Sequence, residues 1–353
     1  MKNLKTVTSD AVALLKTLIA IPSVSREEDA RAAFLQTYIE KHGHTVHREG
    51  NNLWCVSPDF SADKETVMLN SHIDTVRPVA GWMRNPYLPI EEEGRIYGLG
   101  SNDAGASLVT LLHLFFELCR TPQPVNYIFV ASCEEEISGA GGIERVLPLL
   151  PPVAFALVGE PTDMQPAIAE KGLMVLDCTV HGRAGHAARD EGDNAIYRAL
   201  PIIEWFRTYR FERVSPLLGA VKATVTLIHA GTQHNVVPDE CTFTVDVRSN
   251  ECYSNEELYA LITRQRPDCD IRARSFRLNS SHIADTHPFV HRCIALGREP
   301  FGSPTLSDQS LMPFPSLKMG VGQSSRSHTA DEFVCVREIE EAVTLYASLF
   351  CCK

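Results

Sequence analysis

Three consecutive glutamates follow an apolar segment of the chain. The stretch SCEEEISG (132–139) comes directly after Tyr127–Ala131, a run of residue types that is typical of a buried strand. Neighbouring carboxylates repel one another, and they are costly to remove from water without a positive partner. Glu134, Glu135 and Glu136 therefore either extend into solvent or lie beside a cation.

A histidine and an aspartate end another strand-like segment, ETVMLNSHID (65–74). His72 and Asp74 are two residues apart, so on a strand their side chains share one face. Imidazole and carboxylate are both common metal ligands. This segment therefore offers a second group of side chains that suits a metal site.

Two further acids occupy comparable positions. Asp103 lies in the glycine-containing stretch GLGSNDAGA (98–106), just before an expected helix, and Glu160 ends the apolar run VAFALVGE (153–160). Ligands of open parallel sheets gather at the carboxyl ends of the strands. We therefore expect these acids to meet His72 and the glutamates at one edge of a sheet.

Carboxylates gathered at one edge require a cation, and one or two divalent metals would remove the repulsion. Mixed carboxylate and imidazole ligands suit Zn²⁺, with Co²⁺ or Mn²⁺ as possible substitutes, whereas all-oxygen Mg²⁺ or Ca²⁺ sites need no histidine. A second histidine is expected late in the chain, and SHTADEF (327–333) supplies His328.

Each motif also has a simpler explanation. A strand-end H-x-D sequence can form a surface turn, and three glutamates can form a solvated cap. Asp103 can cap the following helix, and Glu160 can be a loop acid before Pro161. Their joint occurrence at the ends of consecutive strands favours the metal site over these separate explanations.

The elements that must position these residues alternate in the first half of the chain. Strands are expected at 65–74, 127–132 and 153–160, with helices at 107–120 and 141–150. Apolar strands separated by helices indicate an α/β fold with a mostly parallel sheet covered on both faces.

The pattern changes between residues 173 and 280. Longer, partly alternating strands are expected at 173–182, 220–231, 241–249 and 270–276, with helices at 194–210 and 255–266. This β-α-β-β-α-β order predicts a small α+β, ferredoxin-like domain.

From about Thr286 the alternation of strands and helices seen in the first half returns, with helices at 288–299 and 336–350. A chain of 353 residues is long for one core. We therefore predict a catalytic domain formed by 1–172 and 281–353, with residues 173–280 inserted.

Composition narrows the possible partners. A formal net charge of −11 and a pI near 5.6 argue against nucleic acid or anionic membrane as the main partner. No apolar run reaches the ~20 residues of a membrane span.

Near the N-terminus, Lys16 interrupts the apolar stretch, which favours an amphipathic helix opened by Thr8, Ser9 or Asp10 over a signal peptide. The eleven cysteines include no C-x-x-C pair, as expected of reduced thiols in a cytoplasmic protein, and a cysteine zinc site is not expected.

Five ordered motifs resemble one family. They are SHIDTV (71–76), GLGSNDAGAS (98–107), CEEEISGAGG (133–142), VGEPT (158–162) and SHTADEF (327–333). The chain resembles the acetylornithine deacetylase and succinyl-diaminopimelate desuccinylase family of dinuclear zinc hydrolases over nearly its whole length. It departs from the family's usual glycine loop after Asp103, where it has Ala104, Gly105 and Ala106, but it keeps the ligand itself.

The resemblance implies a role for each metal-site residue. Asp103 would bridge two Zn²⁺ ions in each subunit, with His72 and Glu160 completing one site, and Glu136 and His328 the other. Asp74 would accept the second ring N–H of His72 and so fix its tautomer. Glu135 would act as the general base on a water molecule and return the proton to the leaving amine. Glu134 would support the site or face solvent.

The resemblance also assigns roles in the inserted domain. His186, in HGRAGHAARD (181–190), would reach across a homodimer and stabilise the oxyanion. Asn235 and Arg248 would bind the substrate, and a guanidinium suits an α-carboxylate. Without the resemblance, His186 could be a surface histidine, and Arg248 could equally form a structural ion pair.

The implied function is a zinc amidohydrolase that removes an N-acyl group from an amino acid, with N-acetylornithine of arginine biosynthesis as the first candidate. Acetylcitrulline, the succinylated forms of ornithine, citrulline or diaminopimelate, and dipeptides are alternatives, because the motifs define the metal centre and leave the side-chain pocket open. A non-catalytic metal-binding scaffold is an alternative of another class, but such a descendant would usually have lost a ligand or the base. A nucleotide site at GLGSNDAG is disfavoured, since the loop lacks the P-loop pattern.

Overall fold

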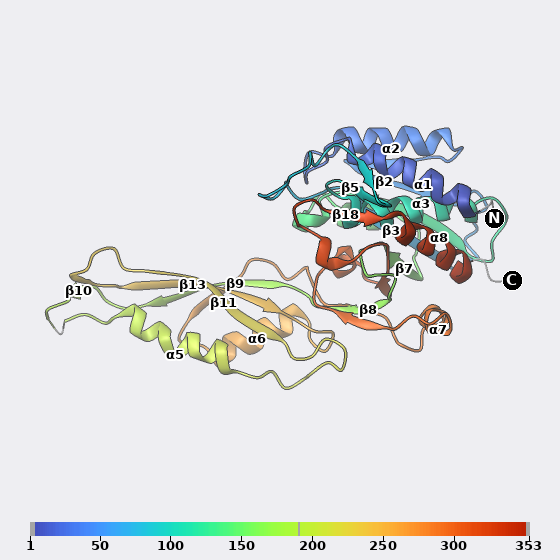
Figure 1. Ribbon diagram of the computed structural model, residues 1–353. Coiled ribbons are helices and arrows are strands. Elements are labelled where there is room, and N and C mark those ends of the chain that lie inside the picture. Colours follow the sequence, from blue (N-terminus) through green and yellow to red (C-terminus); the bar gives the residue numbers. More distant parts are fainter. Residues whose placement is uncertain (1–3, 190, 351–353) are drawn as a thin grey trace. The chain divides into compact units, whose positions relative to one another are not determined.

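The structure is a computed structural model that describes residues 4–189 and 191–350 (Figure 1). Its chain forms two compact units. The first contains residues up to Ile168, Ile283–Phe301, and those from Ser307 onward; the second contains Ala169–His282 and Gly302–Leu306. No helix within the described ranges has both the length and the apolar character needed to cross a membrane.

The helices of the first unit flank its main sheet. They are α1 (Leu4–Ile19), α2 (Asp29–Lys41), α3 (Ala106–Leu118), α4 (Ile143–Val146), α7 (Pro288–Ala295) and α8 (Val336–Phe350). Short helical turns are η1 (Ser101–Gly105), η2 (Glu135–Ile137), η3 (Leu147–Leu149), η4 (Asp308–Leu311) and η5 (Ser324–Arg326). The closing helix has the bounds expected from its apolar periodicity. The helix expected at 141–150 is shorter, because a separate 3-10 turn that contains Pro148 begins at Leu147.

Helix α1 corrects one expectation. The opening at Thr8, Ser9 or Asp10 is wrong, because the helix already includes Leu4. The Thr8 hydroxyl donates to the Leu4 carbonyl at 3.0 Å, as a residue inside a helix does. Val7, which precedes all three of these positions, is already buried.

The main sheet is parallel at its centre. Its strands are β1 (His47–Glu49), β2 (Asn52–Val56), β3 (Thr66–His72), β6 (Asn126–Ser132), β7 (Phe155–Val158), β17 (Ser316–Lys318) and β8 (Ala167–Glu170), in the order β1-β2-β6-β3-β7-β17-β8. The first two residues of β8 belong to the first unit and the last two to the second. Strands β6, β3, β7 and β17 are parallel, whereas β1, β2 and β8 pair antiparallel at the two sides. The expected α/β architecture with a mostly parallel sheet is confirmed.

Both faces of this sheet are covered. Leu69 and Phe129 belong to a core shared with α1, α3 and α8, while the alternate residues Met68 and Ile128 pack with α4. Every residue of β3 and β6 is buried. A smaller sheet in the same unit consists of β4 (Ile90–Glu92), β5 (Arg95–Tyr97) and β18 (Phe333–Cys335).

The second unit has a four-stranded antiparallel sheet with helices α5 and α6 packed against one face (Figure 1). Its elements are β9 (Met174–His181), α5 (Ala195–Thr208), β11 (Lys222–Ala230), β13 (Glu240–Arg248), α6 (Asn255–Gln265) and β14 (Asp270–Ala273). The spatial order β11-β13-β9-β14 is the ferredoxin-like arrangement of a β-α-β-β-α-β chain. Short strands are β10 (Gly185–His186), β12 (Val236–Val237), β15 (Ser281–His282) and β16 (Phe301–Ser303).

The strand through which the chain enters the second unit, β8, is paired with the strand through which it leaves, β15. Strand β15 runs antiparallel to β8, with Ser281 opposite Glu170 and His282 opposite Ala169. The nine cysteines at described positions are all free thiols.

Candidate metal centre

The parallel register of β3 and β6 brings two candidate groups to one edge of the sheet. His72, the last residue of β3, is paired with Ser132, the last residue of β6. The three glutamates come directly after β6, and Glu160 follows the neighbouring strand β7 by two residues. The expected meeting of strand ends therefore takes place in the first unit.

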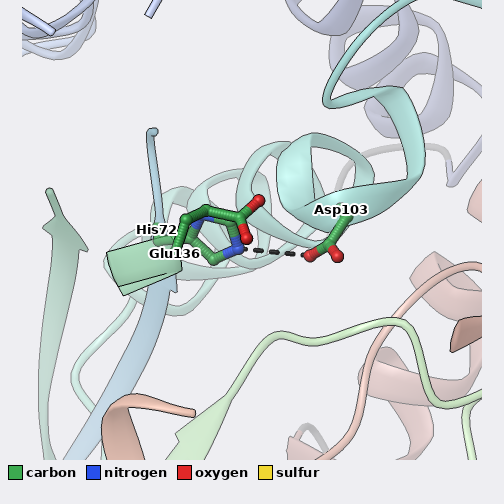
Figure 2. Close-up of side chains that lie close together, drawn as sticks. All are labelled: His72, Asp103 and Glu136. Carbon is green, nitrogen blue, oxygen red and sulfur yellow. Dashed lines mark hydrogen bonds and ion pairs between the residues drawn. The ribbon is translucent and has the colours of Figure 1, made fainter. Parts of the chain in front are cut away.

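Asp103 lies beside His72 (Figure 2). The His72 Nε2 atom is 3.3 Å from Asp103 Oδ1 and 3.8 Å from Glu160 Oε1. One set of potential ligand atoms, all within 4.8 Å of one another, comes from His72, Asp103 and Glu136; a second set comes from His72, Glu135 and Glu160. Asp103 does not cap helix α3, since the N-cap is Gly105 and no side-chain cap bond is formed.

His328 approaches the same aspartate from the late part of the chain. Its Nε2 atom is 2.8 Å from Glu136 Oε2 and 3.5 Å from Asp103 Oδ2. One carboxylate oxygen of Asp103 therefore faces His72 and the other faces His328. That is the arrangement a carboxylate adopts when it bridges two cations, with one histidine at each.

Burial and mutual repulsion shift the pKa values of the acids. Burial raises the pKa of Glu135 well above its usual range, and the charge of Glu160 raises it further. Burial raises the pKa of Glu160 to about 8, with Asp103 adding to the effect and His72 opposing it. The same causes raise the pKa of Glu136, although its hydrogen bond with His328 works against them. Without a cation, the cluster therefore retains protons.

The pKa values of the two histidines are raised as well, because carboxylates lie beside both rings. Burial alone would lower the pKa of His72, but hydrogen bonds with Asp103 and Asp74 raise it well above its usual range. The hydrogen bond with Glu136 raises the pKa of His328 to about 9. Burial opposes ionisation of Asp103, yet the hydrogen bond with His72 leaves its pKa below the usual value.

The residues present fit a pair of divalent metal ions. Glu160 Oε1 is buried and has no hydrogen-bond partner among the residues that the structure describes, which is costly unless a cation satisfies it. The side chains of Glu136 and His72 are 5% and 1% exposed, so neither the glutamate run nor the H-x-D motif forms a solvated turn. His72 and Glu160 would hold one ion, Glu136 and His328 the other, and Asp103 both.

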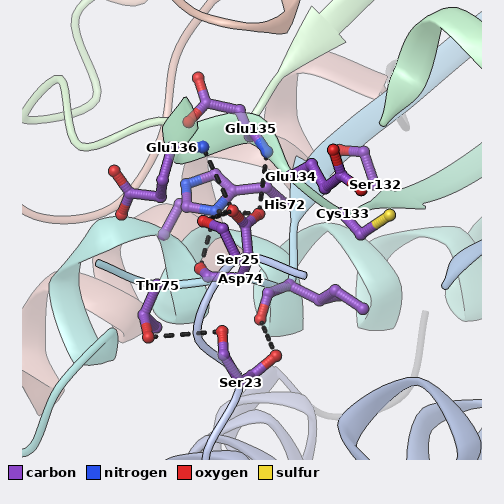
Figure 3. A network of polar contacts seen from close by, with 12 residues as sticks. Ser23, Ser25, His72, Asp74, Thr75, Ser132, Cys133, Glu134, Glu135 and Glu136 are labelled. Atoms are coloured by element: carbon purple, nitrogen blue, oxygen red, sulfur yellow. Dashed lines mark hydrogen bonds and ion pairs between the residues drawn. The ribbon is translucent and has the colours of Figure 1, made fainter. Parts of the chain in front are cut away.

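Asp74 acts on the backbone of the glutamate turn (Figure 3). Its carboxylate accepts the N–H of Glu135 at 3.1 Å, the N–H of Glu136 at 3.2 Å and the Ser25 hydroxyl at 2.6 Å. The nearer acceptor for His72 Nδ1 is the Asp74 backbone carbonyl at 3.0 Å; the carboxylate oxygen is 3.5 Å away. That this carboxylate accepts the ring N–H stays a prediction: its Oδ1 atom lies beside Nδ1, and the two oxygens also accept the three donors named above.

Glu134 turns away from the cluster. It adopts a left-handed backbone conformation with φ of 54°, and one of its carboxylate oxygens accepts the N–H of Gly141 at 3.3 Å. Its own N–H donates to Glu28. Consecutive residues Glu134, Glu135 and Glu136 thus point in different directions.

Sequence reasoning missed a buried acid behind the cluster. Asp308, which is 4% exposed, accepts the hydroxyl of Ser132 at 2.5 Å. Burial raises the pKa of Asp308 to about 6. Nothing in the spacing of the segment LSDQS pointed to this contact, because the two residues are 176 positions apart. Glu332, in the motif SHTADEF, is a second buried acid to which the sequence pattern assigns no role.

The remaining predicted residues belong to the second unit. His186 is exposed on β10, and its Nδ1 atom accepts the N–H of Ala188 at 3.1 Å. The Asn235 carbonyl accepts the N–H of Ala187 at 3.0 Å. Arg248 donates to both carboxylate oxygens of Asp246, at 2.8 and 3.0 Å. Arg248 therefore forms an ion pair with Asp246, which is one of the two roles considered for it from the sequence.

Known proteins share both the sequence pattern and the fold. The family described as Peptidase family M20/M25/M40 matches residues 68–351. A succinyl-diaminopimelate desuccinylase of Corynebacterium glutamicum is 27% identical over 95% of each chain. A putative succinyl-diaminopimelate desuccinylase of Mycobacterium tuberculosis is also 27% identical, over 95% of this chain and 96% of its own.

Two solved structures are similar over almost the full length. The aminopeptidase PepT of Bacillus cereus has a TM-score of 0.78 at 18% identity, over 97% of this chain and 98% of its own. A dinuclear metal-binding peptidase of the M20 family from Bacillus subtilis has a TM-score of 0.73 at 16% identity, over 98% of each chain. At these identities the likeness shows the fold.

Proposed function

Because the chain belongs to peptidase family M20/M25/M40 and is a metal-dependent amide hydrolase, we propose that it removes the N-acyl group from an N-acylated amino acid, with N-acetylornithine as the first candidate substrate. The observation that carries the proposal is the cluster itself. Two histidines and three carboxylates suit two metal positions, and the Glu135 carboxylate beside them is left for proton transfer.

Divalent metals at these positions, with Zn²⁺ as the first choice and Co²⁺ or Mn²⁺ as substitutes, would polarise the amide carbonyl and lower the pKa of water. Glu135 would take the proton of the attacking water and return it to the leaving amine. Its backbone is held by Asp74, and its raised pKa suits a group that must retain a proton between the two steps. Amide hydrolysis then yields a carboxylate and a free amino acid.

The second unit would supply groups that bind the substrate. Because His186 Nδ1 accepts a backbone N–H, a neutral ring carries its proton on Nε2. That N–H is a donor suited to a developing oxyanion, in the role the resemblance gives His186. Asn235, next to β12, would donate its side-chain amide to the substrate. Arg248 Nη1 has no hydrogen-bond partner among the described residues and would bind the α-carboxylate while Asp246 holds the other side of the guanidinium.

Dimerisation is part of the proposal. Within the described residues β11 pairs only with β13, so it is an edge strand of its sheet. Leu227 and Ile228 on this strand are 52% and 50% exposed, and Tyr197 and Leu200 on α5 are 71% and 54% exposed. An exposed apolar edge of this kind suits pairing with a second copy of the chain. His186 would then act on the partner's substrate.

A second substrate is favoured by the relatives. Two of them are described as succinyl-diaminopimelate desuccinylases, so N-succinyl-diaminopimelate ranks directly after N-acetylornithine. Acetylcitrulline, succinylated ornithine or citrulline, and dipeptides follow. For N-acetylornithine the product would serve arginine biosynthesis in the cytoplasm, in keeping with the free thiols.

The test is a panel of initial hydrolysis rates with Zn²⁺-loaded protein. It contains the N-acetyl and N-succinyl forms of ornithine, citrulline, lysine and diaminopimelate and one dipeptide, with the freed amine as the readout. E135Q serves as the control for background hydrolysis. Preference for one N-acyl amino acid supports the proposal. Turnover of the dipeptide alone, or of no member with two metals bound, contradicts it and favours a peptidase or a metal-binding scaffold.

A further inference from the structure

One buried carboxylate joins two segments that both carry proposed metal ligands. Glu332 is 2% exposed and lies four residues after His328. Its Oε1 atom accepts the N–H groups of Asn102 and Asp103, at 2.8 and 2.9 Å, and its Oε2 atom accepts the N–H of Gly100 at 2.9 Å. The backbone carbonyl of Glu332 accepts the N–H of Gly98 at 3.0 Å.

The side chain of Asn102 joins the same two segments a second time. Its carbonyl oxygen accepts the N–H of Gln323 at 3.0 Å, and its amide donates to the Gln323 carbonyl at 3.1 Å and to the Ser327 hydroxyl at 3.3 Å. Segments 98–103 and 323–332 are therefore held together by hydrogen bonds at Asp103 and at the residues just before it.

The position of Asp103 needs this support. Its two oxygens lie 3.3 Å from His72 Nε2 and 3.5 Å from His328 Nε2, so a small shift of its backbone would disturb both metal positions. The loop is also closely packed. Gly100 has φ of 74°, and a Cβ atom there would lie 2.5 Å from the Thr75 methyl group. A carboxylate suits three converging N–H donors because it has two acceptor oxygens and no hydrogen.

We infer that Glu332 is a positioning residue that fixes Asp103 between the two metal positions, so that losing its carboxylate weakens binding of both metals. This inference rests on the metal ligands of the proposed function. Glu332 touches neither a metal position nor the substrate in this role; it acts through the backbone of the Asp103 loop.

The test variant is E332Q, which keeps the size of the side chain. A glutamine retains one acceptor oxygen, but its amide NH₂ would face one of the three N–H donors. Losses of about 10- to 100-fold are typical when support of a metal ligand is removed. We expect a loss of this size for each of the two Zn²⁺ ions, measured by calorimetric titration of metal-free protein. The visible spectrum of the Co²⁺-loaded form should change, and at saturating metal kcat should fall more than KM changes.

A matched control is E338Q. Glu338 also has a partly buried carboxylate, which accepts the N–H of Cys335 at 2.9 Å and two bonds from Arg326 at 2.8 Å, but none from the Asp103 loop. The E338Q substitution should lower the melting temperature of the metal-free protein while leaving both metal affinities unchanged. If E332Q does not fold by far-UV circular dichroism, N102A removes the other attachment of the loop and should weaken both metals in the same way.

The outcomes separate this inference from the proposed function. If wild-type protein binds no metal, the proposed metal centre is wrong. If wild-type protein binds two metals and E332Q or N102A binds both equally well, with an unchanged Co²⁺ spectrum, the positioning role of Glu332 is wrong. Weakening of only the ion at His328 would also overturn it, because that result places the effect on the His328 segment and not on Asp103.

Discussion

The carboxylate of Asp74 accepts the backbone N–H of Glu135 at 3.1 Å, so the acid two residues after His72 orients the proposed general base. Its other oxygen accepts the N–H of Glu136 at 3.2 Å. The turn after β6 is thereby held from the end of β3. This explains how adjacent glutamates are given different directions: Glu136 lies toward His328, and Glu135 lies beside His72 and Glu160.

Replacing Asp74 by asparagine should reduce kcat about 10- to 100-fold while both metals remain bound, because support is lost without loss of a ligand. An asparagine has only one acceptor oxygen for the two backbone N–H groups and the Ser25 hydroxyl. Steady-state kinetics and metal analysis check this. S25A removes only one donor and should have a smaller effect; wild-type kcat in D74N would show that the turn needs no such support.

Replacing Glu135 by glutamine should keep two metals per subunit and lower kcat by at least about 10²–10⁴-fold, the usual contribution of a general base. The amide has a similar shape but cannot take a proton. Mass spectrometry of bound metal and the rate with the preferred substrate of the panel check both parts. Retained turnover would remove Glu135 from the proton-transfer role.

Replacing His328 by alanine should reduce the bound metal from two ions to one. The remaining ion would be held by His72, Glu160 and Asp103. Metal stoichiometry after dialysis checks this, with H291A, an exposed histidine of the same unit, as the control that keeps two ions. Loss of both ions would mean that the two positions are not separable.

Asp308 should make the stability of the metal-free protein depend on pH. Burial raises its pKa in the folded protein to about 6, from the ordinary value of 3.8, so the folded state holds a proton that the unfolded chain has released. The resulting stability is present below pH 4 and is lost as the pH rises through 6, by roughly 2–3 kcal/mol at most. In metal-free protein, D308N should therefore gain stability relative to wild type across this interval.

Urea unfolding of both proteins at pH 4, 5, 6 and 7 measures the difference. The exposed acid Asp285 provides the control, because D285N should show no such trend. A constant difference between D308N and wild type would mean that Asp308 does not titrate in this range.

The sequence predicted those parts of the molecule that depend on local patterns and on strand ends. The apolar runs located β3, β6 and β7, and the rule that parallel strands end together led to His72, Asp103 and Glu160. Helix α8 was predicted at its observed bounds because its apolar periodicity is regular. These signals depend only on residues that are near one another in the chain.

Contacts between distant segments were not predictable in the same way. The bonds from Asp308 to Ser132 and from Glu332 to the Asp103 loop join residues 176 and about 230 positions apart. No local pattern shows that the Asp74 carboxylate also accepts two backbone N–H groups of the glutamate turn. The beginning of α1 was placed too late, because Thr8, Ser9 and Asp10 are good cap residues that also occur inside a helix.

The pairing of β8 with β15 sets the distance between the two ends of the inserted segment. Because Glu170 and Ser281 are opposite each other, the chain leaves and returns one strand spacing apart, about 4.8 Å. A segment with adjoining ends can be lengthened, shortened or exchanged without pulling the flanking strands apart. The ferredoxin-like unit can therefore change in length or sequence while β8 and β15 stay paired and the strand order of the main sheet is kept.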